Sequence, residues 1–260
     1  MKIIDLNDKY KAIYFVCLED LSEEMKEAGD HKEFWFNKMK DKGLEVKLTI
    51  DDTGKVVGMI QYIPIEYSFA EGNDLYFILC IWVLGYEKGR ENLQKKGLGT
   101  ALLKTAENSA KAKGAKGMVA WGLSSPFFMR AKWFEKHGYM NVDKQGIQVL
   151  LWKPFTDDAI PPKWFREKKK PEPVSVKVII TAFINGWCPS NNIAFERAKR
   201  AALEFGDKVE FREINTIDRK IVLEWGIVDA LFIDDKQVRK RPPPSYEKIK
   251  KLIAKKVKKL

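Results

Sequence analysis

A run of ten residues, LYFILCIWVL at 75–84, limits the fold more than any other part of the chain. Nearly every side chain in it is apolar. The run is too short for a membrane helix, which needs about 20 residues. It also lacks the alternation of a strand that faces water on one side. It therefore predicts a central strand that is covered on both faces, as in an α/β fold.

The segments around this run predict a mixed sheet flanked by helices. Residues 45–52 and 55–63 alternate and form a predicted antiparallel hairpin with a turn at 52–54. Apolar runs predict further strands at 117–123 and 147–153, and helical spacing predicts helices at 10–26, 31–43, 99–114 and 127–139.

A glycine-containing turn follows the run, in ENLQKKGLGTALLKTAE at 91–107. Such a turn can bind phosphate, because backbone N–H groups converge on the anion and the helix N-terminus adds a partial positive charge. A nucleotide-triphosphate loop requires Lys after its last glycine, where this chain has Thr100. A dinucleotide-binding turn requires a third glycine three residues after Gly99, where Leu102 stands. A helix start without a ligand stays open as an alternative.

Two motifs and the order of the elements resemble the GNAT acetyltransferase superfamily over residues 1–153. The motifs are QKKGLG at 94–99, after a buried strand, and AKWFEKHGY at 131–139, which is similar to the family's Ala-x-x-(Leu-Tyr)-Glu-Lys-x-Gly-Phe helix. The resemblance implies a GNAT-type mixed sheet and acetyl transfer from acetyl-coenzyme A to a small-molecule or peptide amine. The cofactor-binding residues that it implies are Ile81, Trp82, Val83, Gln94, Lys95, Lys96, Gly97, Leu98, Gly99 and Thr100.

The sequence departs from the family at groups that move protons or contact the coenzyme. Phe134 stands where many members carry a tyrosine that protonates the leaving thiolate, and a phenyl ring has no such proton. Phe128 replaces an asparagine that commonly opens this helix. A carboxylate near the cleft is expected as the base that deprotonates the amine. Glu87 is the candidate retained, with Glu91 and Asp74 as the others considered.

Other side chains in this half are expected to pack. Tyr139 falls where the family packs an aromatic ring into the core, and His137 occupies a leucine-like position in its helix. The aromatic residues 34–36 fit either the core or the lining of an acceptor pocket.

Charge and proline content divide the chain. Residues 1–160 hold 23 Lys and Arg against 23 Asp and Glu, whereas residues 161–260 hold 24 against 13, so the whole net charge of +11 lies in the last hundred residues. The basic stretch 154–173 contains five prolines, which remove amide donors and favour extended backbone. We expect it to be a linker between domains at 1–153 and 174–260.

Residues 174–260 resemble a thioredoxin-like domain, and the two domains together look like acetyltransferases with a YoaP-like C-terminal region. A β-branched run leads into Trp187-Cys188-Pro189 at the redox position, and a helix follows. The second cysteine of a Cys-x-x-Cys motif is missing, since Asn191 stands there, and Asp229 falls in the region that normally holds a proline. These departures disfavour disulfide exchange. Cys188 then either reacts as a single thiol, with a low-molecular-weight thiol or an acyl group, or packs in a partner-binding scaffold.

The content of cysteine, histidine and basic residues bears on the cellular compartment and on the kinds of ligand that the chain could bind. Three cysteines without metal-like spacing and two distant histidines predict neither a disulfide framework nor a metal site. Without a signal-like N-terminus or a membrane span, we expect a soluble cytoplasmic protein. The basic tail at 246–260 has one apolar face, which a thioredoxin-like fold would bury. Nucleic-acid binding is therefore disfavoured.

Three classes of function stay open on the sequence alone. They are a coenzyme A-dependent acyltransferase, which is the interpretation we favour, a thiol-dependent redox or mixed-disulfide protein acting through Cys188, and a non-catalytic module that binds coenzyme A or a partner. The sequence identifies neither the acceptor nor the oligomeric state.

Overall fold

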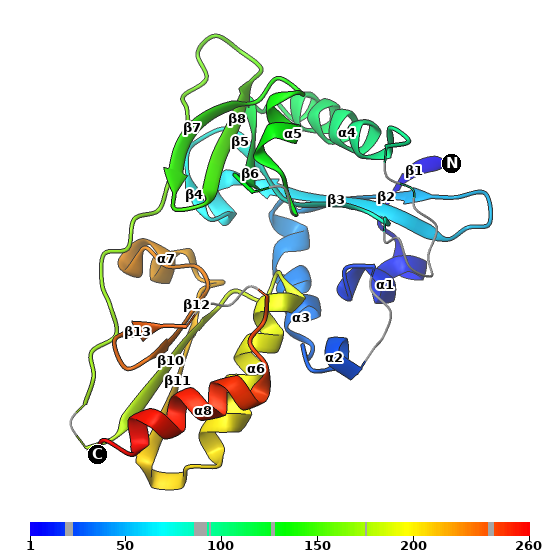
Figure 1. The fold of residues 1–260 in the computed structure, drawn as a ribbon. Coiled ribbons are helices and arrows are strands. Elements are labelled where there is room, and N and C mark those ends of the chain that lie inside the picture. The colour runs from blue at the N-terminus through cyan, green and yellow to red at the C-terminus, as the bar shows by residue number, and fades with distance from the viewer. Residues whose placement is uncertain (19–22, 86–92, 94, 126–127, 175, 239–241) are drawn as a thin grey trace. The chain divides into compact units, whose positions relative to one another are not determined.

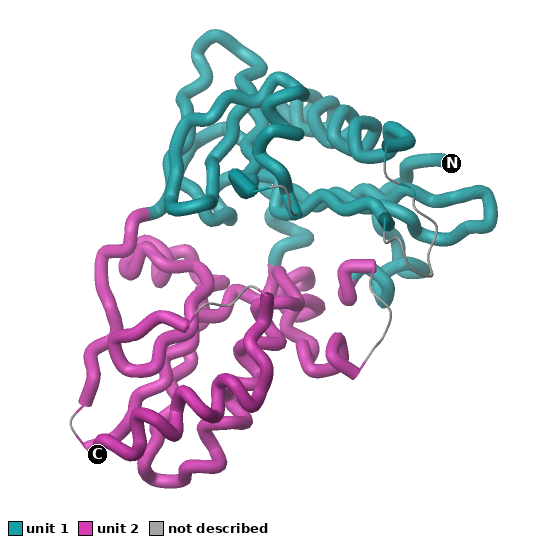
Figure 2. Tube along the Cα trace, in the orientation of Figure 1, with its two compact units in different colours: residues 1–14, 39–165 teal, residues 15–38, 166–260 magenta. Residues whose placement is uncertain are grey.

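The computed structural model describes residues 1–18, 23–85, 93, 95–125, 128–174, 176–238 and 242–260 (Figure 1). The chain forms two compact units, coloured separately in Figure 2. The first unit contains residues 1–14 and 39–165, and the second contains residues 15–38 and 166–260. Residues 15–38 thus belong with the C-terminal part of the chain, although the sequence assigned them to the N-terminal domain.

The first unit is built on a seven-stranded mixed sheet. Its order is β1-β2-β3-β5-β6-β8-β7, and β5 and β6 are its one parallel pair among the described strands. The apolar run forms β5 in the middle of the sheet, which confirms the prediction of a central strand. The strands are β1 (Lys2–Asp5), β2 (Glu45–Ile50), β3 (Val56–Pro64), β5 (Leu75–Val83), β6 (Gly117–Leu123), β7 (Met140–Gln145) and β8 (Gln148–Pro154).

A second, two-stranded sheet extends this unit beyond the predicted domain boundary. Strand β4 (Ala70–Glu71) pairs with β9 (Lys163–Trp164), which lies within the stretch expected as a linker. The side chains of Trp164 and Phe165 are buried, and the Trp164 amide donates to the Asp143 carboxylate at 2.8 Å. The proline-rich stretch is therefore ordered against the first unit up to residue 165.

Helices α4 (Leu98–Ala112) and α5 (Ala131–Glu135) lie side by side on one face of the large sheet (Figure 1). Leu102, Leu103 and Ala106 follow helical spacing and are fully buried. Each buried leucine contributes about 1.5–3 kcal/mol relative to an exposed one. The chain leaves α4 through Gly114, which has a left-handed backbone and ends the helix as predicted.

The predicted helix at 10–26 is broken in the structure. Helix α1 ends at Phe15 (Lys11–Phe15), and α2 begins at Glu23 (Glu23–Lys26). Cys17 and Leu18 have positive φ values of 53° and 63°. A residue in that region cannot continue a right-handed helix, so the prediction of one continuous helix was wrong.

The second unit contains a four-stranded sheet in the order β11-β10-β12-β13. Parallel strands β10 and β11 are joined by helix α6, and β12 and β13 run antiparallel to their neighbours. The strands are β10 (Val178–Ile184), β11 (Val209–Asn215), β12 (Ala230–Ile233) and β13 (Lys236–Gln237), and the helices are α3 (His31–Met39), α6 (Pro189–Leu203), α7 (Arg219–Trp225) and α8 (Tyr246–Val257).

Alternate side chains of β10 enter two separate cores. Ile180 and its alternate neighbours pack with α6 and α8, whereas Phe183 packs with β12 and with Trp225 of α7. Ile249 and Ile253 of α8 are fully buried in the first of these cores. The apolar face of the basic C-terminal helix is therefore used for packing, which confirms that interpretation.

Residues 15–38 are attached to α6 by ion pairs. Arg197 is buried, and its guanidinium donates to Glu27 at 2.8 Å, to Glu24 at 3.2 Å and to the Pro244 carbonyl at 3.2 Å. Hydrogen bonding from Arg197 lowers the pKa of Glu27 against the opposing effect of burial. The Nε2 atom of His31 lies 2.6 Å from the Glu196 carboxylate. This polar contact region fixes α2 and α3 on the second unit.

Candidate functional site

The two central strands of the first unit separate towards one end. Parallel pairing between β5 and β6 covers Leu75 to Ile78 and stops there. A bulge follows, because Gln61 pairs with Cys80 while Tyr62 pairs with Ile78. The Trp121 indole N–H donates to the Leu79 carbonyl at 2.8 Å and bridges the strands where they part. Beyond this point β5 continues to Val83 beside β3 alone among the strands that the structure describes.

The direction of the β5 amides follows from one hydrogen bond. The Leu84 amide donates to the Val57 carbonyl at 2.9 Å and therefore points to the β3 side. Successive amides of a strand point to opposite edges, so the amides of Ile81 and Val83 face the side from which β6 has departed. That edge is suited to pair with an extended ligand.

Aromatic side chains stand at the opening between the strands. The ring centroids of Trp82 and Phe128 lie 5.6 Å apart, and those of Trp121 and Phe128 lie 6.1 Å apart. Phe128 is 37% exposed, whereas Trp121 is buried. Phe128, where the family commonly has asparagine, therefore contributes an apolar surface to this opening.

The glycine turn leads from the end of β5 into α4. The Leu93 amide donates to the Leu84 carbonyl at 3.1 Å, so the loop returns to the strand that it left. Lys95 has a φ of 62°, and Gly97, directly before the helix, has a φ of 80°. A Cβ built on Gly97 would meet nothing within 4 Å. Glycine adopts this backbone without strain and leaves the space in front of the helix open.

The first turn of α4 carries the donors of an anion site. Its first intrahelical bond runs from the Ala101 amide to the Gly97 carbonyl at 3.0 Å. The amides of Leu98, Gly99 and Thr100 precede that bond and point out of the helix end, where the helix dipole is positive. Lys95 and Lys96 are exposed beside them and add positive charge.

Helix α5 contacts the same turn. The Trp133 ring would lie 3.3 Å from a Cβ built on Gly99, so glycine permits this close approach. The Thr100 hydroxyl lies 2.9 Å from His137 Nε2, and His137 Nδ1 lies 2.7 Å from the Trp133 carbonyl. This contact was not predicted, because residues that lie far apart in the sequence and on different helices leave no spacing signal.

None of the candidate bases is found at the opening among the residues that the structure describes. Glu87 and Glu91 lie outside the described residues, as does Gln94 of the turn. Asp74, 3.6 Å from Lys116, directly precedes the other end of strand β5 and lies about 25 Å along the strand from Trp82 at the opening. Asp74 is therefore excluded as the base. It directly precedes β5 in the sequence, but the opening lies at the other end of that strand.

Two aromatic residues of the second motif are packed away from the opening. Phe134 is fully buried, and Tyr139 is 3% exposed with its ring 5.5 Å from that of Phe134. Burial raises the pKa of Tyr139 well above its usual value, and the nearby Glu107 carboxylate adds to the rise. Neither ring is positioned to protonate a leaving group at the opening.

A strongly perturbed carboxylate lies at the other end of α4. Burial alone would raise the pKa of Glu45, but hydrogen bonds from Lys113, Tyr62 and Ser109 outweigh it and lower the pKa to about 2. Helix α4 has 15 residues, so this cluster lies about 20 Å from the glycine turn. Glu45 therefore ties β2 to the helix and takes no part in the site.

In the second unit, Cys188 directly precedes α6. It is partly exposed, and the backbone amide of Asn191, three residues further on, donates to the Cys188 carbonyl at 3.0 Å. Asp229 lies in the same region, since it accepts from the Trp187 indole at 3.2 Å and from the Asn185 amide at 3.1 Å. The Asp229 carboxylate thus holds the loop that carries the cysteine.

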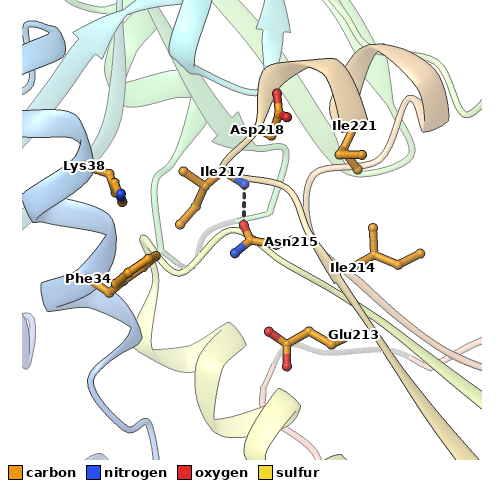
Figure 3. A pocket seen from close by; sticks show the side chains of 8 residues that line it. All are labelled: Phe34, Lys38, Glu213, Ile214, Asn215, Ile217, Asp218 and Ile221. Atoms are coloured by element: carbon orange, nitrogen blue, oxygen red, sulfur yellow. Dashed lines mark hydrogen bonds between the residues drawn. The ribbon is translucent and has the colours of Figure 1, made fainter.

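A shallow cavity of about 530 Å³ also lies in the second unit (Figure 3). Phe34 and Lys38 of α3 form one side, and isoleucines from the β11–α7 region form the other, where the Ile217 amide donates to the Asn215 side chain at 3.0 Å. Phe34 is 53% exposed, whereas Trp35 and Phe36 are buried. Phe34, one of the aromatic residues expected either in the core or in a pocket lining, thus lines this cavity, whereas none of the predicted cofactor-binding or catalytic residues does.

Two classes of site are absent from the part of the chain that the structure describes. No three His, Cys, Asp or Glu side chains gather there in a way that would hold a metal ion. Within the same residues, no helix has both the length and the hydropathy to cross a membrane.

Comparison with known proteins gives one family. The family described as Acetyltransferase (GNAT) family matches residues 6–139. No curated protein matches the chain.

Solved structures similar to this chain include three acetyltransferases. A GNAT family acetyltransferase from Staphylococcus aureus Mu50 is 18% identical, with 60% of this chain and 99% of that chain covered and a TM-score of 0.43. An aminoglycoside 6'-acetyltransferase type Ii is 18% identical, with 59% and 97% covered and a TM-score of 0.44. A GNAT family acetyltransferase from Elizabethkingia anophelis with acetyl-CoA bound is 21% identical, with 59% and 97% covered and a TM-score of 0.40.

Proposed function

Because the chain belongs to the acetyltransferase (GNAT) family, we propose that it transfers an acetyl group from acetyl-coenzyme A to an amine. The observation that carries the proposal is the start of α4, where open space in front of Gly97 meets three outward amides beside the edge of β5 that the described strands leave free. When bound, acetyl-coenzyme A supplies an activated thioester whose acetyl group moves to the amine.

The residues at the start of α4 fit the diphosphate of the coenzyme. The amides of Leu98, Gly99 and Thr100 would donate to its oxygens, and Lys95 and Lys96 would balance its charge. Gln94, outside the described residues, completes the proposed turn. A larger side chain at Gly97 would occupy the space that the anion needs.

The end of β5 fits the other end of the coenzyme. The amides of Ile81 and Val83 face the free edge, so the extended arm would pair with them as a strand does, with Trp82 between them. An amide aimed at the thioester carbonyl would stabilise the negative charge that develops on its oxygen. Such a donor commonly contributes about 3–4 kcal/mol to the transition state.

Proton transfer needs a base for the amine and a proton for the leaving thiolate. We retain Glu87 as the proposed base, because its loop leaves β5 at Leu84 and returns to it at Leu93. With Phe134 and Tyr139 buried, the thiolate would take its proton from solvent. Trp82 and Phe128 would contact the apolar part of a small-molecule or peptide amine.

For the second unit we propose a thioredoxin-like fold with an accessory role. The parallel β10-α6-β11 unit, the antiparallel β12 and β13 and the final helix α8 support this fold. Asn191 rules out a dithiol at this position, so Cys188 serves either as a single reactive thiol or as a packed residue of a partner-binding scaffold, which we favour. Three cysteines without the spacing of a disulfide framework fit a reducing compartment such as the cytoplasm.

Alkylation separates these two roles of Cys188. Iodoacetamide labelling of the full chain, followed by peptide mass spectrometry, reads each cysteine separately, with the buried Cys80 as the slow internal control. Labelling of Cys188 faster than a model thiol at pH 7 would support a reactive thiol. Labelling at or below the model rate would support the scaffold.

Calorimetry on the full chain tests the proposed cofactor. We expect acetyl-coenzyme A and coenzyme A to bind while ATP, the control for a general phosphate site, does not. A panel of amines then tests transfer by the release of coenzyme A thiol. Absence of coenzyme binding would overturn the proposal. Binding without thiol release from any amine would instead favour a non-catalytic module.

A further inference from the structure

His137 bridges two helices through both of its ring nitrogens. Nδ1 lies 2.7 Å from the Trp133 carbonyl within α5, and Nε2 lies 2.9 Å from the Thr100 hydroxyl in the first turn of α4. The ring also packs against that of Trp133, with centroids 4.2 Å apart and the ring planes tilted by 39°. Trp133 in turn borders Gly99. The imidazole is therefore held in one orientation beside the proposed diphosphate site.

These contacts determine which nitrogen carries the hydrogen. A carbonyl oxygen only accepts, so Nδ1 must donate to the Trp133 carbonyl. In the neutral ring Nε2 then has a lone pair and accepts the hydrogen of the Thr100 hydroxyl. Thr100 is thereby prevented from donating to any other group, and its oxygen lone pairs are what it presents to an anion.

Protonation of His137 reverses the direction of this bond. Nε2 then carries a hydrogen and donates to the Thr100 oxygen, which releases the hydroxyl hydrogen for another acceptor. The same step places a positive charge beside the start of α4. An anion at the amides of Leu98 to Thr100 would gain both a donor and a cation.

The charged groups around the ring belong to three elements. On α5, Lys132 and Glu135 are exposed, and so is Lys136 directly after the helix. On α4, Lys104 follows Thr100 by one turn, and Glu107 lies one turn further, paired with Lys153 of β8 at 2.9 Å. Lys153 also donates to the His137 backbone carbonyl at 3.1 Å. Among the described residues both hydrogen-bond partners of the ring are uncharged, so a bound anion would be the main new influence on it.

We propose that His137 is a positioning residue for coenzyme A, which sets the donor direction of the Thr100 hydroxyl and takes up a proton when the diphosphate binds. This inference rests on the proposed function, because it requires the coenzyme to bind at the start of α4. Since the complex would favour the imidazolium, affinity should rise as the pH falls.

Dephospho-coenzyme A is the probe that isolates this effect. It keeps the diphosphate but lacks the terminal phosphate monoester, which itself titrates near neutral pH. Calorimetry at pH 7 in two buffers of different ionisation enthalpy counts the protons taken up on binding. We expect uptake of a fraction of a proton and affinity about tenfold tighter at pH 6 than at pH 8. Pantetheine, without a diphosphate, should show neither effect.

Substitutions at His137 and Thr100 distinguish a role in positioning the coenzyme from a role in folding. His137→Phe retains a ring to stack on Trp133 and should abolish both the uptake and the pH dependence. Thr100→Val should weaken binding at pH 6 more than at pH 8, and Thr100→Ser should restore it. The chain has two histidines, so ¹⁵N NMR of the wild type against His137→Phe assigns the ring and should show the Nδ1–H tautomer when it is neutral.

The outcomes are distinct. Binding of dephospho-coenzyme A without proton uptake, or uptake that persists in His137→Phe, would overturn the role of His137 and leave the proposed function intact. An Nε2–H tautomer would overturn it as well. If neither coenzyme A nor its dephospho form binds, the proposed function fails and this inference fails with it.

Discussion

Replacement of Gly97 by aspartate should change stability and coenzyme binding in opposite directions. The matched control is Gly97→Asn, because both side chains have nearly the same shape and both tolerate the left-handed backbone at φ 80°. Nothing lies within 4 Å of the new Cβ, so neither variant meets a steric clash. Both variants therefore lose the same stability through the replacement of glycine. The difference between them in stability or in coenzyme affinity measures the effect of one negative charge.

The magnitudes follow from the position before α4. A carboxylate at a helix N-terminus gains about 0.3–1 kcal/mol from the helix dipole, so Gly97→Asp should be at least as stable as Gly97→Asn. For a coenzyme diphosphate about 6 Å away, each of its two charges is repelled by about 0.7 kcal/mol at the dielectric constant of water and by about 1.4 kcal/mol at half that value, as for a partly exposed pair. Binding should fall by about 1.5–3 kcal/mol, or roughly 10- to 100-fold.

The assay pairs urea unfolding with calorimetric titration of coenzyme A. Gly114, at the other end of the same helix, also has a left-handed backbone and open space. Gly114→Asp should be less stable than Gly114→Asn, because the dipole is reversed there, and should bind the coenzyme normally. Equal coenzyme affinity in Gly97→Asp and Gly97→Asn would refute the reasoning, since the amides of α4 would then not hold an anion.

Three further predictions concern stability. Glu45 has a pKa of about 2 in the folded chain and 4.5 when unfolded, so its contribution, at most about 3 kcal/mol, is present above pH 4.5 and is lost as the pH falls towards 2. Urea unfolding from pH 2 to 5 should show a shallower loss in Glu45→Gln, and equal slopes would contradict this. Gly226→Ala should cost at least about 2 kcal/mol in urea unfolding, because the Cβ would lie 1.8 Å from the Arg166 carbonyl, whereas Gly206→Ala, with open space, should cost about 1 kcal/mol. Arg197→Met should lower stability by about 1–3 kcal/mol and speed hydrogen exchange at 23–38, and unchanged exchange there would show that the ion pairs do not hold α2 and α3.

Local patterns in the sequence predicted the elements that depend on local physics. The apolar run became β5 because only a central strand buries such side chains on both faces. Gly97 directly precedes α4 and Gly114 follows it, since both need a left-handed backbone. In the second unit β10, α6 and α8 fall where the sequence predicted them. Strand β7, by contrast, is a mostly polar edge strand without an apolar pattern and was missed.

The parts that failed depend on contacts between distant residues. The bond between Thr100 and His137 joins two helices, and no spacing rule connects such positions. The predicted helix breaks at Cys17 and Leu18, which have a left-handed backbone. Neither residue is a glycine or a proline, so the sequence carries no local signal of the break, which the surrounding structure imposes. Of the candidate bases, Asp74 lay at the wrong end of β5, and Glu87 lies beyond the described residues.

The ion pairs between α2 and α6 have a consequence for the order in which the chain acquires structure. Residues 15–38 leave the ribosome long before Arg197 and Glu196, the side chains that hold them, have been synthesised. At about 5–20 residues per second the wait lasts about 10–30 s. During that interval Glu24, Glu27 and His31 lack their counterparts. A chain that ends at residue 165 would lack these partners permanently. Truncation at that single point therefore leaves residues 15–38 of the acetyltransferase region without the side chains that hold them.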